Sequence, residues 1–336
     1  MRKKIGMRIV AAVLVLLAAG VVAVLAGNDY RLTETRTTVP VPGGSLDAVL
    51  AGPAGGTARG LVVMIHGDGP VEATHDGLYR PWFEAAADAG FVTLSWSKPG
   101  VGASTGDWLA QSMADRAAEA SAVIDWARGR PDVPTGPVVL WGASQAGWVL
   151  PEVAARRDDI AAVVAVSPAV NWLRQGRFNL LAELDHAGAG AAERDRAVAV
   201  SDRTRRLLAE GASYRTYVDT AGDPQPMSAG RWAFVLRNHT ADATAGLRAM
   251  GRRGVPVLLM LGEHDRNVDI AETEAAYRQA LGPAVRVEHF DAAHSMAAPV
   301  MEDSRVAGFV TALFRPRALL ADGVLGTYRA YLEARP

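Results

Sequence analysis

The chain has 336 residues, of which 49% are hydrophobic and 21% charged, a composition typical of a folded globular protein and not of a disordered or fibrous one. Its 35 basic and 36 acidic residues nearly balance, so no overall positive charge is available to hold a nucleic-acid backbone. The absence of cysteine excludes disulfides, thiolate metal sites and cysteine nucleophiles. We therefore expect no nucleic-acid partner, and any catalysis must use oxygen and nitrogen groups.

The chain begins with a basic segment followed by an uncharged one. Four basic residues within the first eight precede an uncharged run over residues 9–26, the arrangement of a segment that targets a chain to a membrane. At 18 residues this run is longer than most signal-peptide cores and slightly shorter than a comfortable bilayer span. Residues 1–26 are thus predicted to be either a signal peptide, with Val24 and Ala26 before the cleavage point, or a retained transmembrane anchor. Either alternative predicts an exported protein, with the remaining chain on the outer side of the membrane.

Short apolar runs alternate with helix-like patterns over the rest of the chain. Residues 31–39 and 45–51 flank the turn Pro42-Gly43-Gly44, which predicts two antiparallel strands at one edge of a sheet. The alternation beyond them predicts an α/β fold with a mostly parallel central sheet flanked by helices. Six apolar runs are predicted to be parallel strands covered on both faces: 61–65, 91–96, 137–141, 161–166, 255–261 and 285–290.

One interval is too long to be a simple crossover. Residues 171–253 separate two predicted strands by about 80 residues. We predict an inserted helical cap there, with a core formed by residues 28–170 and 254–336. The cap carries 13 Arg against 9 acidic residues, which favours an anionic substrate or lipid surface, or only a solvated Arg-rich surface. Its aromatic residues are expected either to line an acyl pocket or to form the core of the cap: Trp172, Phe178, Trp232 and Phe234.

Two serines compete for the role of nucleophile. Residues 102–106, around Ser104, match the pattern G-x-S-x-G literally, and residues 142–147, around Ser144, match it with Ala146 in the final small position. A nucleophile elbow needs a strand before the serine and a helix just after it, because the strained turn lifts the hydroxyl above the sheet. Ser144 directly follows a predicted strand and precedes a helix, whereas Ser104 stands in a loop. Ser144 is therefore the predicted nucleophile, and Ser104 is expected to cap a turn.

A serine hydroxyl needs a base and an orienting acid to act as a nucleophile. His294 lies on the loop just after the last predicted strand, which makes it the preferred base over His289 inside that strand. Asp265 follows the preceding strand and is the predicted acid, with Glu263 and Asp269 as fallback acids.

The turn after the strand at 61–65 has the sequence His66-Gly67-Asp68-Gly69-Pro70. Its backbone can aim the N–H of Asp68 at a developing oxyanion, together with the N–H of Gln145 at a helix start. We expect the Asp68 carboxylate to turn outward or to hydrogen-bond the loop, because it would otherwise repel the oxyanion. The seven histidines show no paired ligand spacing on one helix, so no metal or other cofactor is predicted.

These motifs together resemble the α/β-hydrolase superfamily, in particular bacterial esterase-like members grouped with the serine aminopeptidase type. The resemblance covers roughly residues 45–314, and its supports include the turn at 66–70 and the Gly-rich segment 98–106. The elbow at Ser144 and then the acid and the histidine follow in the order that this topology dictates.

The chain departs from the family pattern at two positions. Ser97 stands where relatives often carry Asp, and Ala146 replaces the second Gly of the elbow. Neither residue is a predicted reacting group, but the methyl of Ala146 lies at a tight crossing.

The resemblance implies a serine hydrolase that cleaves small or medium acyl esters through an acyl-enzyme, with peptide or amide hydrolysis as the runner-up. A non-catalytic binding protein on the same fold remains an alternative, because fold does not determine function. A nucleotide-dependent oxidoreductase is disfavoured, since the glycines at 100, 102 and 106 fit the dinucleotide fingerprint poorly.

Overall fold

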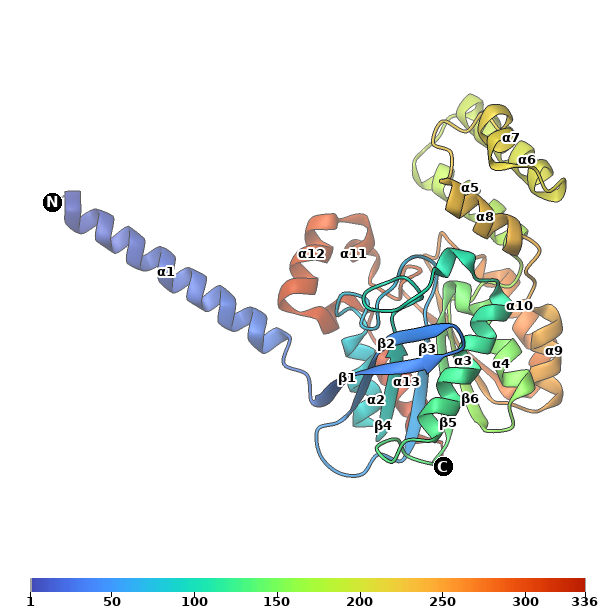
Figure 1. Ribbon diagram of the computed structural model, residues 1–336. Helices are drawn as coiled ribbons and strands as arrows, with labels where there is room; N and C mark the ends of the chain where they lie inside the picture. Colours follow the sequence, from blue (N-terminus) through green and yellow to red (C-terminus); the bar gives the residue numbers. More distant parts are fainter. Residues whose placement is uncertain (1, 336) are drawn as a thin grey trace.

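An eight-stranded sheet runs through the centre of the molecule (Figure 1). The computed structural model describes the backbone of residues 2–335 and the side chains of residues 13–335. All neighbouring strands are parallel except the pairs β1–β2 and β2–β4, which are antiparallel. In spatial order the strands are β1 (Leu32–Val41), β2 (Gly44–Pro53), β4 (Phe91–Trp96), β3 (Gly60–Ile65), β5 (Val138–Ala143), β6 (Ile160–Val166), β7 (Val257–Gly262) and β8 (Val285–Phe290).

The strand predictions from sequence are confirmed. The antiparallel hairpin is present, with Val41 paired to Gly44 across the predicted turn. The six predicted parallel strands all occur, with ends that shift by one or two residues. These strands could be recognised as continuous apolar runs, because a strand that is buried on both faces does not alternate between apolar and polar residues.

The sheet has a separate hydrophobic core on each face. Along β3, Leu61 and Val63 pack into one core, whereas Val62 and Met64 pack into the other, as the two-residue period of a strand requires. The first core contains residues of α3 (Met113–Arg128), α4 (Leu150–Arg156), α9 (Thr244–Arg252) and α10 (Ile270–Leu281), and the second contains residues of α2 (Arg80–Asp88) and α13 (Val324–Glu333). Short 3₁₀ helices occur at η1 (Trp108–Ala110), η2 (Ser144–Trp148), η3 (Gly282–Ala284) and η4 (Pro316–Leu319).

The predicted cap interval 171–253 holds five helices. Four of them form the group that projects from the body in Figure 1: α5 (Trp172–His186), α6 (Ala191–Ala209), α7 (Tyr214–Thr220) and α8 (Ala229–Asn238). Trp232 and Tyr217 stack within this group with ring centroids 4.2 Å apart. The fifth helix, α9, packs against α4 and α10 beside the sheet. The interval therefore includes one helix of the core layer.

The N-terminal helix α1 (Arg2–Gly27) extends away from the body (Figure 1). Its end lies against α12 (Arg305–Phe314), where the side-chain amide of Asn28 donates to the Leu313 carbonyl at 2.9 Å. The short helix α11 (Pro299–Asp303) precedes α12. Among the residues that the structure describes, none of the helices combines the length and apolarity needed to span a membrane. Residues 1–12 of the predicted targeting segment lie outside the described side chains, and the export of the protein stays a prediction.

Gly147 allows η2 to approach the chain just beyond β6. A Cβ at this position would overlap the carbonyl oxygen of Ala169 and would lie 2.8 Å from its backbone nitrogen. Because backbone atoms cannot move aside as a flexible side chain can, Gly147→Ala should lower the free energy of unfolding by about 3 kcal/mol in a denaturant titration. Gly176→Ala on α5 is the control, since nothing lies within 4 Å of that Cβ. Equal stability of the two variants would contradict the close approach.

Candidate active site

Ser144 stands at the sharp turn between β5 and η2. β5 ends at Ala143, η2 begins at Ser144, and Ser144 itself has a φ of +54°. A non-glycine residue at positive φ is strained, and such strain recurs at functional sites and at nucleophile elbows. The helix expected after Ser144 is divided into η2 and α4, because Pro151 occupies the first turn of α4 and begins a new helix there.

Small residues let the backbone close around this turn. A Cβ on Gly67 would lie 3.3 Å from the Ser144 Cβ, so the turn after β3 approaches Ser144 closely. The methyl of Ala146 is fully buried, and a Cβ on Gly142 would come within 2.8 Å of it. The departure at Ala146 is therefore accommodated by the glycine at position 142.

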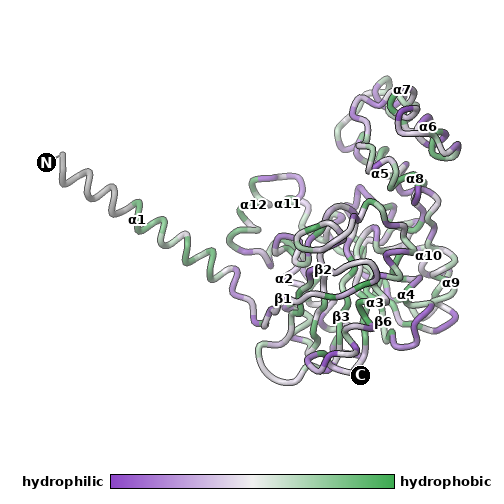
Figure 2. The backbone as a smooth tube through the Cα atoms, in the orientation of Figure 1, coloured by the Kyte–Doolittle hydropathy of each residue, from purple (hydrophilic) through white to green (hydrophobic). Residues whose placement is uncertain are grey.

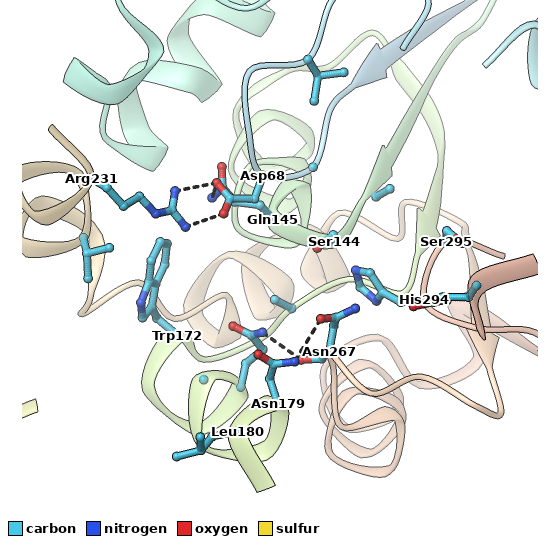
Figure 3. Close-up of a pocket in the computed structure, with 18 of the residues that line it drawn as sticks. Asp68, Ser144, Gln145, Trp172, Asn179, Leu180, Arg231, Asn267, His294 and Ser295 are labelled. Carbon is cyan, nitrogen blue, oxygen red and sulfur yellow. Dashed lines mark hydrogen bonds and ion pairs between the residues drawn. The ribbon is translucent and has the colours of Figure 1, made fainter. Parts of the chain in front are cut away.

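His294 and Asp265 form a hydrogen-bonded pair on the loops that follow β8 and β7. The His294 Nδ1 and the Asp265 Oδ2 are 2.8 Å apart, and the Asp265 side chain is 0% exposed. The other oxygen, Oδ1, accepts the backbone N–H groups of Asn267 at 2.8 Å and Val268 at 2.9 Å. Ser144 and His294 line one pocket, and Figure 3 shows the imidazole on the Ser144 side of it. Among the hydrogen bonds of the described residues, none joins the Ser144 hydroxyl to His294.

The alternative residues are occupied elsewhere. The Ser104 hydroxyl donates to the Ser97 carbonyl at 2.7 Å and accepts the N–H of Asp47, so it holds a loop together. His289 contacts Glu274 at 2.7 Å, and Asp269 caps the start of α10. Neither Ser104, His289 nor Asp269 lines the pocket that contains Ser144.

Asp68 and Gln145 lie beside Ser144, and none of the described hydrogen bonds uses their backbone N–H groups. Their side chains meet, since the Gln145 Nε2 donates to the Asp68 Oδ1 at 2.8 Å. The Asp68 carboxylate also forms a bidentate ion pair with Arg231 of α8 (Figure 3). Burial alone would raise the pKa of Asp68, but the hydrogen bonds and charge of Arg231 outweigh it and lower that pKa below its usual range. The Asp68 carboxylate therefore stays charged to a lower pH than an ordinary Asp carboxylate does.

Two buried basic side chains next to this turn, those of Arg116 and Lys98, were missed by the sequence analysis. Arg116 of α3 is 6% exposed and donates to the Gln145 Oε1 and to the His66 carbonyl, each at 2.6 Å. Lys98 donates to the Gly67 carbonyl, and burial together with the charge of Arg116 lowers the pKa of Lys98 well below its usual range. For Arg116, helical spacing in the sequence could have predicted burial, because this residue falls on the buried apolar face of α3.

Helix α5 also holds the loop that carries Asp265. From α5, the Asn179 side chain donates to the Asn267 Oδ1 at 3.0 Å, and the Gln175 side chain donates to the Asn267 carbonyl at 2.8 Å (Figure 3). Since Asn267 itself donates to Asp265, α5 fixes the loop on which the orientation of His294 depends.

The pocket above Ser144 has a volume of about 1600 Å³ and extends between the cap and the segment around α12. Of the four cap aromatics, Trp172 lines this pocket and stacks on Trp148 with centroids 4.8 Å apart. Trp232 and Phe234 are buried in packing contacts, and Phe178 does not line the pocket. Within the described part of the chain, no cluster of three or more histidine, aspartate or glutamate side chains could hold a metal ion.

The pairing of Arg231 with Asp68 leads to a prediction for the rate. Without Arg231, the Asp68 carboxylate would keep its negative charge beside the place where an oxyanion would form. We expect Arg231→Gln to lower kcat about ten-fold, and the added change Asp68→Asn to restore most of it, because that change removes the repelling charge. Stability should fall by less than about 1 kcal/mol, since both side chains are partly exposed. Equal kcat values for the single and double variants would rule out this electrostatic effect.

The comparisons with known proteins agree with this geometry. The sequence model of the family "Serine aminopeptidase, S33" matches residues 56–296, well over half of the chain. A search of curated proteins found no match. Among solved structures, an esterase from Pyrococcus furiosus is similar with a TM-score of 0.55 and 14% identity, over 86% of this chain and 92% of that one.

Two further solved structures share the fold. Est1E from Butyrivibrio proteoclasticus, with bound ferulic acid, has a TM-score of 0.53 and 16% identity over 88% of this chain and 96% of that one. A dienelactone hydrolase from Anabaena variabilis has a TM-score of 0.50 and 19% identity over 85% of this chain and 98% of that one. With the sheet order and the family match, they establish the fold: the chain belongs to the α/β-hydrolase superfamily, in its serine aminopeptidase-like family.

Proposed function

We propose that the protein is a serine hydrolase that cleaves carboxylic esters, with Ser144 as nucleophile, His294 as base and Asp265 as the orienting acid. The observation that carries the proposal is the position of the strained Ser144 in one pocket with a histidine hydrogen-bonded to a fully buried aspartate. Esterase neighbours and the hydrolase family support the reaction class.

In the proposed mechanism, the His294 Nδ1–H donates to Asp265, which leaves the Nε2 lone pair to accept the Ser144 proton as the hydroxyl attacks the ester carbonyl. The N–H groups of Asp68 and Gln145 would hold the oxyanion, at about 3 kcal/mol for each donor. His294 then protonates the leaving alcohol, and water releases the acyl group by the same steps in reverse order. The mechanism needs no metal and no other cofactor.

Peptide or amide hydrolysis is the second candidate, because the matched family is described as serine aminopeptidases. The two functions differ in the leaving group, an alcohol or an amine, and the same triad chemistry serves both. Comparing kcat/KM on an acyl ester and on an aminoacyl amide of the same size decides between them. A higher kcat/KM on the amide would make amide hydrolysis the preferred function.

The experiment that tests the proposal is labelling with a fluorophosphonate, followed by peptide mapping. The wild-type protein and Ser104→Ala should be labelled at residue 144, whereas Ser144→Ala should take up no label. Ser104 is a matched control because it lies in the other G-x-S-x-G pattern and hydrogen-bonds a loop. Absence of label on folded wild-type protein, or label that persists in Ser144→Ala, would refute the proposal and favour a non-catalytic binding protein.

A further inference from the structure

The exposed apolar residues of the described chain are concentrated in one region. Of the sixteen large hydrophobic side chains that are exposed, eight lie in α1 and five in α11 and α12. Figure 2 shows the described second half of α1 and much of α12 in green. The two helices also touch, since a Cβ on Gly27 would overlap the Phe314 carbonyl. Most of the exposed apolar residues therefore lie in α1 and in the segment of α11 and α12, where α1 and α12 are in contact.

On α12 these residues form a single stripe. Val306, Phe309, Val310 and Leu313 recur at helical spacing and are 74%, 68%, 46% and 38% exposed. Such spacing places all four on one face of the helix. We call this set the α12 stripe. Monomeric soluble proteins rarely expose so contiguous an apolar surface, which usually marks a contact with a protein or a membrane.

The charges around the α12 stripe favour an anionic lipid surface as its partner. Residues 304–321 contain three arginines and no acidic residue. Arg305 and Arg315, at the two ends of α12, are exposed, and no ion pair among the described residues involves either of them. The two acidic residues before α12, Glu302 and Asp303, both form ion pairs with Arg266. An apolar face flanked by arginines is typical of helices that lie in the interface of an anionic membrane.

The α12 stripe also borders the pocket of Ser144. Phe309 belongs to the stripe and lines that pocket, as do Gly308 and Ala312 on the adjoining side of α12. Leu319 and Leu320 continue the lining inward from α12. An apolar path therefore runs from the surface that carries the stripe to the pocket of the nucleophile.

We propose that the α12 stripe docks the protein onto an anionic lipid surface, from which an ester with a long acyl chain enters the pocket past Phe309. The docking rests on the surface alone, whereas the delivery of an ester to Ser144 rests on the proposed function. The long acyl chain would remain in an apolar environment throughout, because both the lipid layer and the path beside α12 are apolar.

Docking is tested first, with a fluorophore at position 310. Because the natural chain contains no cysteine, Val310→Cys in the full chain can be labelled at one site with nitrobenzoxadiazole. Val218→Cys on α7 is the matched control, since Val218 is 42% exposed and lies in the cap. Vesicles of phosphatidylcholine with phosphatidylglycerol should raise and blue-shift the emission at position 310 only. Unchanged emission at position 310, or an equal change at both positions, would overturn the docking.

Delivery is tested by comparing two substrates. Val306→Glu/Val310→Glu places two charges within the α12 stripe and changes no pocket-lining residue. Hydrolysis of a palmitoyl ester dissolved in the same vesicles should fall about ten-fold or more, while hydrolysis of soluble p-nitrophenyl butyrate should not change. Val218→Glu should leave both rates unchanged. Since α1 is present in every variant, the differences report on α12.

The outcomes separate the two proposals. If the wild type hydrolyses neither ester but position 310 enters the vesicles, the proposed function fails and the docking stands. If the butyrate is hydrolysed but the double variant keeps the full rate on the vesicle ester, the delivery is refuted. A change in oligomeric state of the double variant, with unaltered vesicle hydrolysis, would show that a second copy of the chain covers the stripe instead.

Discussion

Asp265→Asn should lower kcat on a soluble ester by about 10⁴-fold while the protein stays folded. The Asp265 Oδ1 accepts two backbone N–H groups, from Asn267 and Val268, and the Oδ2 faces the His294 Nδ1. In an asparagine, the oxygen must stay with the two N–H donors, so the NH₂ group turns toward His294. The Nδ1 then has to accept a hydrogen bond, which moves the ring proton to Nε2 and leaves no lone pair to receive the serine proton.

Asp269→Asn is the control for this variant. Asp269 is also an acid shortly after β7, but its side chain caps α10 by accepting the N–H groups of Ala271 and Glu272. Asparagine caps helices about as well as aspartate, so neither kcat nor stability should change appreciably. Thermal unfolding and kcat are measured for both variants. A folded Asp265→Asn protein that keeps more than a tenth of the wild-type kcat would show that Asp265 does not orient the base.

Arg116→Met should lower kcat about 10- to 100-fold and reduce stability by about 3 kcal/mol. Its guanidinium holds the Gln145 side chain and the His66 carbonyl from behind the turn, and its removal leaves both acceptors without this donor in a buried place. Each unsatisfied buried acceptor costs about 1–3 kcal/mol. The rate falls because the backbone at Asp68 and Gln145 is no longer held in the geometry that the oxyanion requires. Because Arg116 does not line the pocket, we expect it to act as a positioning residue that does not touch substrate.

Arg128→Met separates this effect from a general loss of stability. Arg128 lies at the other end of α3 and also donates to backbone carbonyls, those of Pro134 and Gly136. Its loss should destabilise the protein in a similar way, but kcat measured well below the unfolding temperature should not change. If both variants lower kcat equally, or if Arg116→Met affects only KM, the positioning role of Arg116 is wrong.

The strands and the turn at Ser144 could be predicted from the sequence because each depends on residues that are adjacent in the chain. Apolar runs predicted the strands, and small residues around Ser144 predicted a sharp turn, since both patterns reflect the backbone geometry of a few adjacent residues. The order in which the serine, the aspartate and the histidine follow strand ends predicted that they would lie together. The structure places Ser144 and His294 in one pocket, with Asp265 buried behind His294 and hydrogen-bonded to it, and leaves Ser104 outside the pocket.

Other features arise only from contacts between distant segments. Helical spacing could indicate that Arg116 is buried, but only packing reveals that Arg116 and Lys98 hold the carbonyls of the turn after β3. The ion pair of Asp68 with Arg231 joins residues 163 positions apart, which no local pattern encodes. The length of the interval 171–253 predicted that it is more than a simple crossover, but the placement of α9 beside α4 and α10 is a matter of tertiary packing.

The sequence by itself determined the sheet, the elbow and the candidate reacting groups, because these follow from periodicity and from conformations that few residue types can adopt. Only the tertiary structure showed that helices α8 and α5 bind the turn at Asp68 and the loop at Asn267. It also showed that the α12 stripe borders the pocket. The physical reason is that hydrogen bonds and apolar contacts between distant segments form only when the tertiary fold brings those segments together. The residues adjacent to each partner in the sequence do not determine which distant segment it will contact.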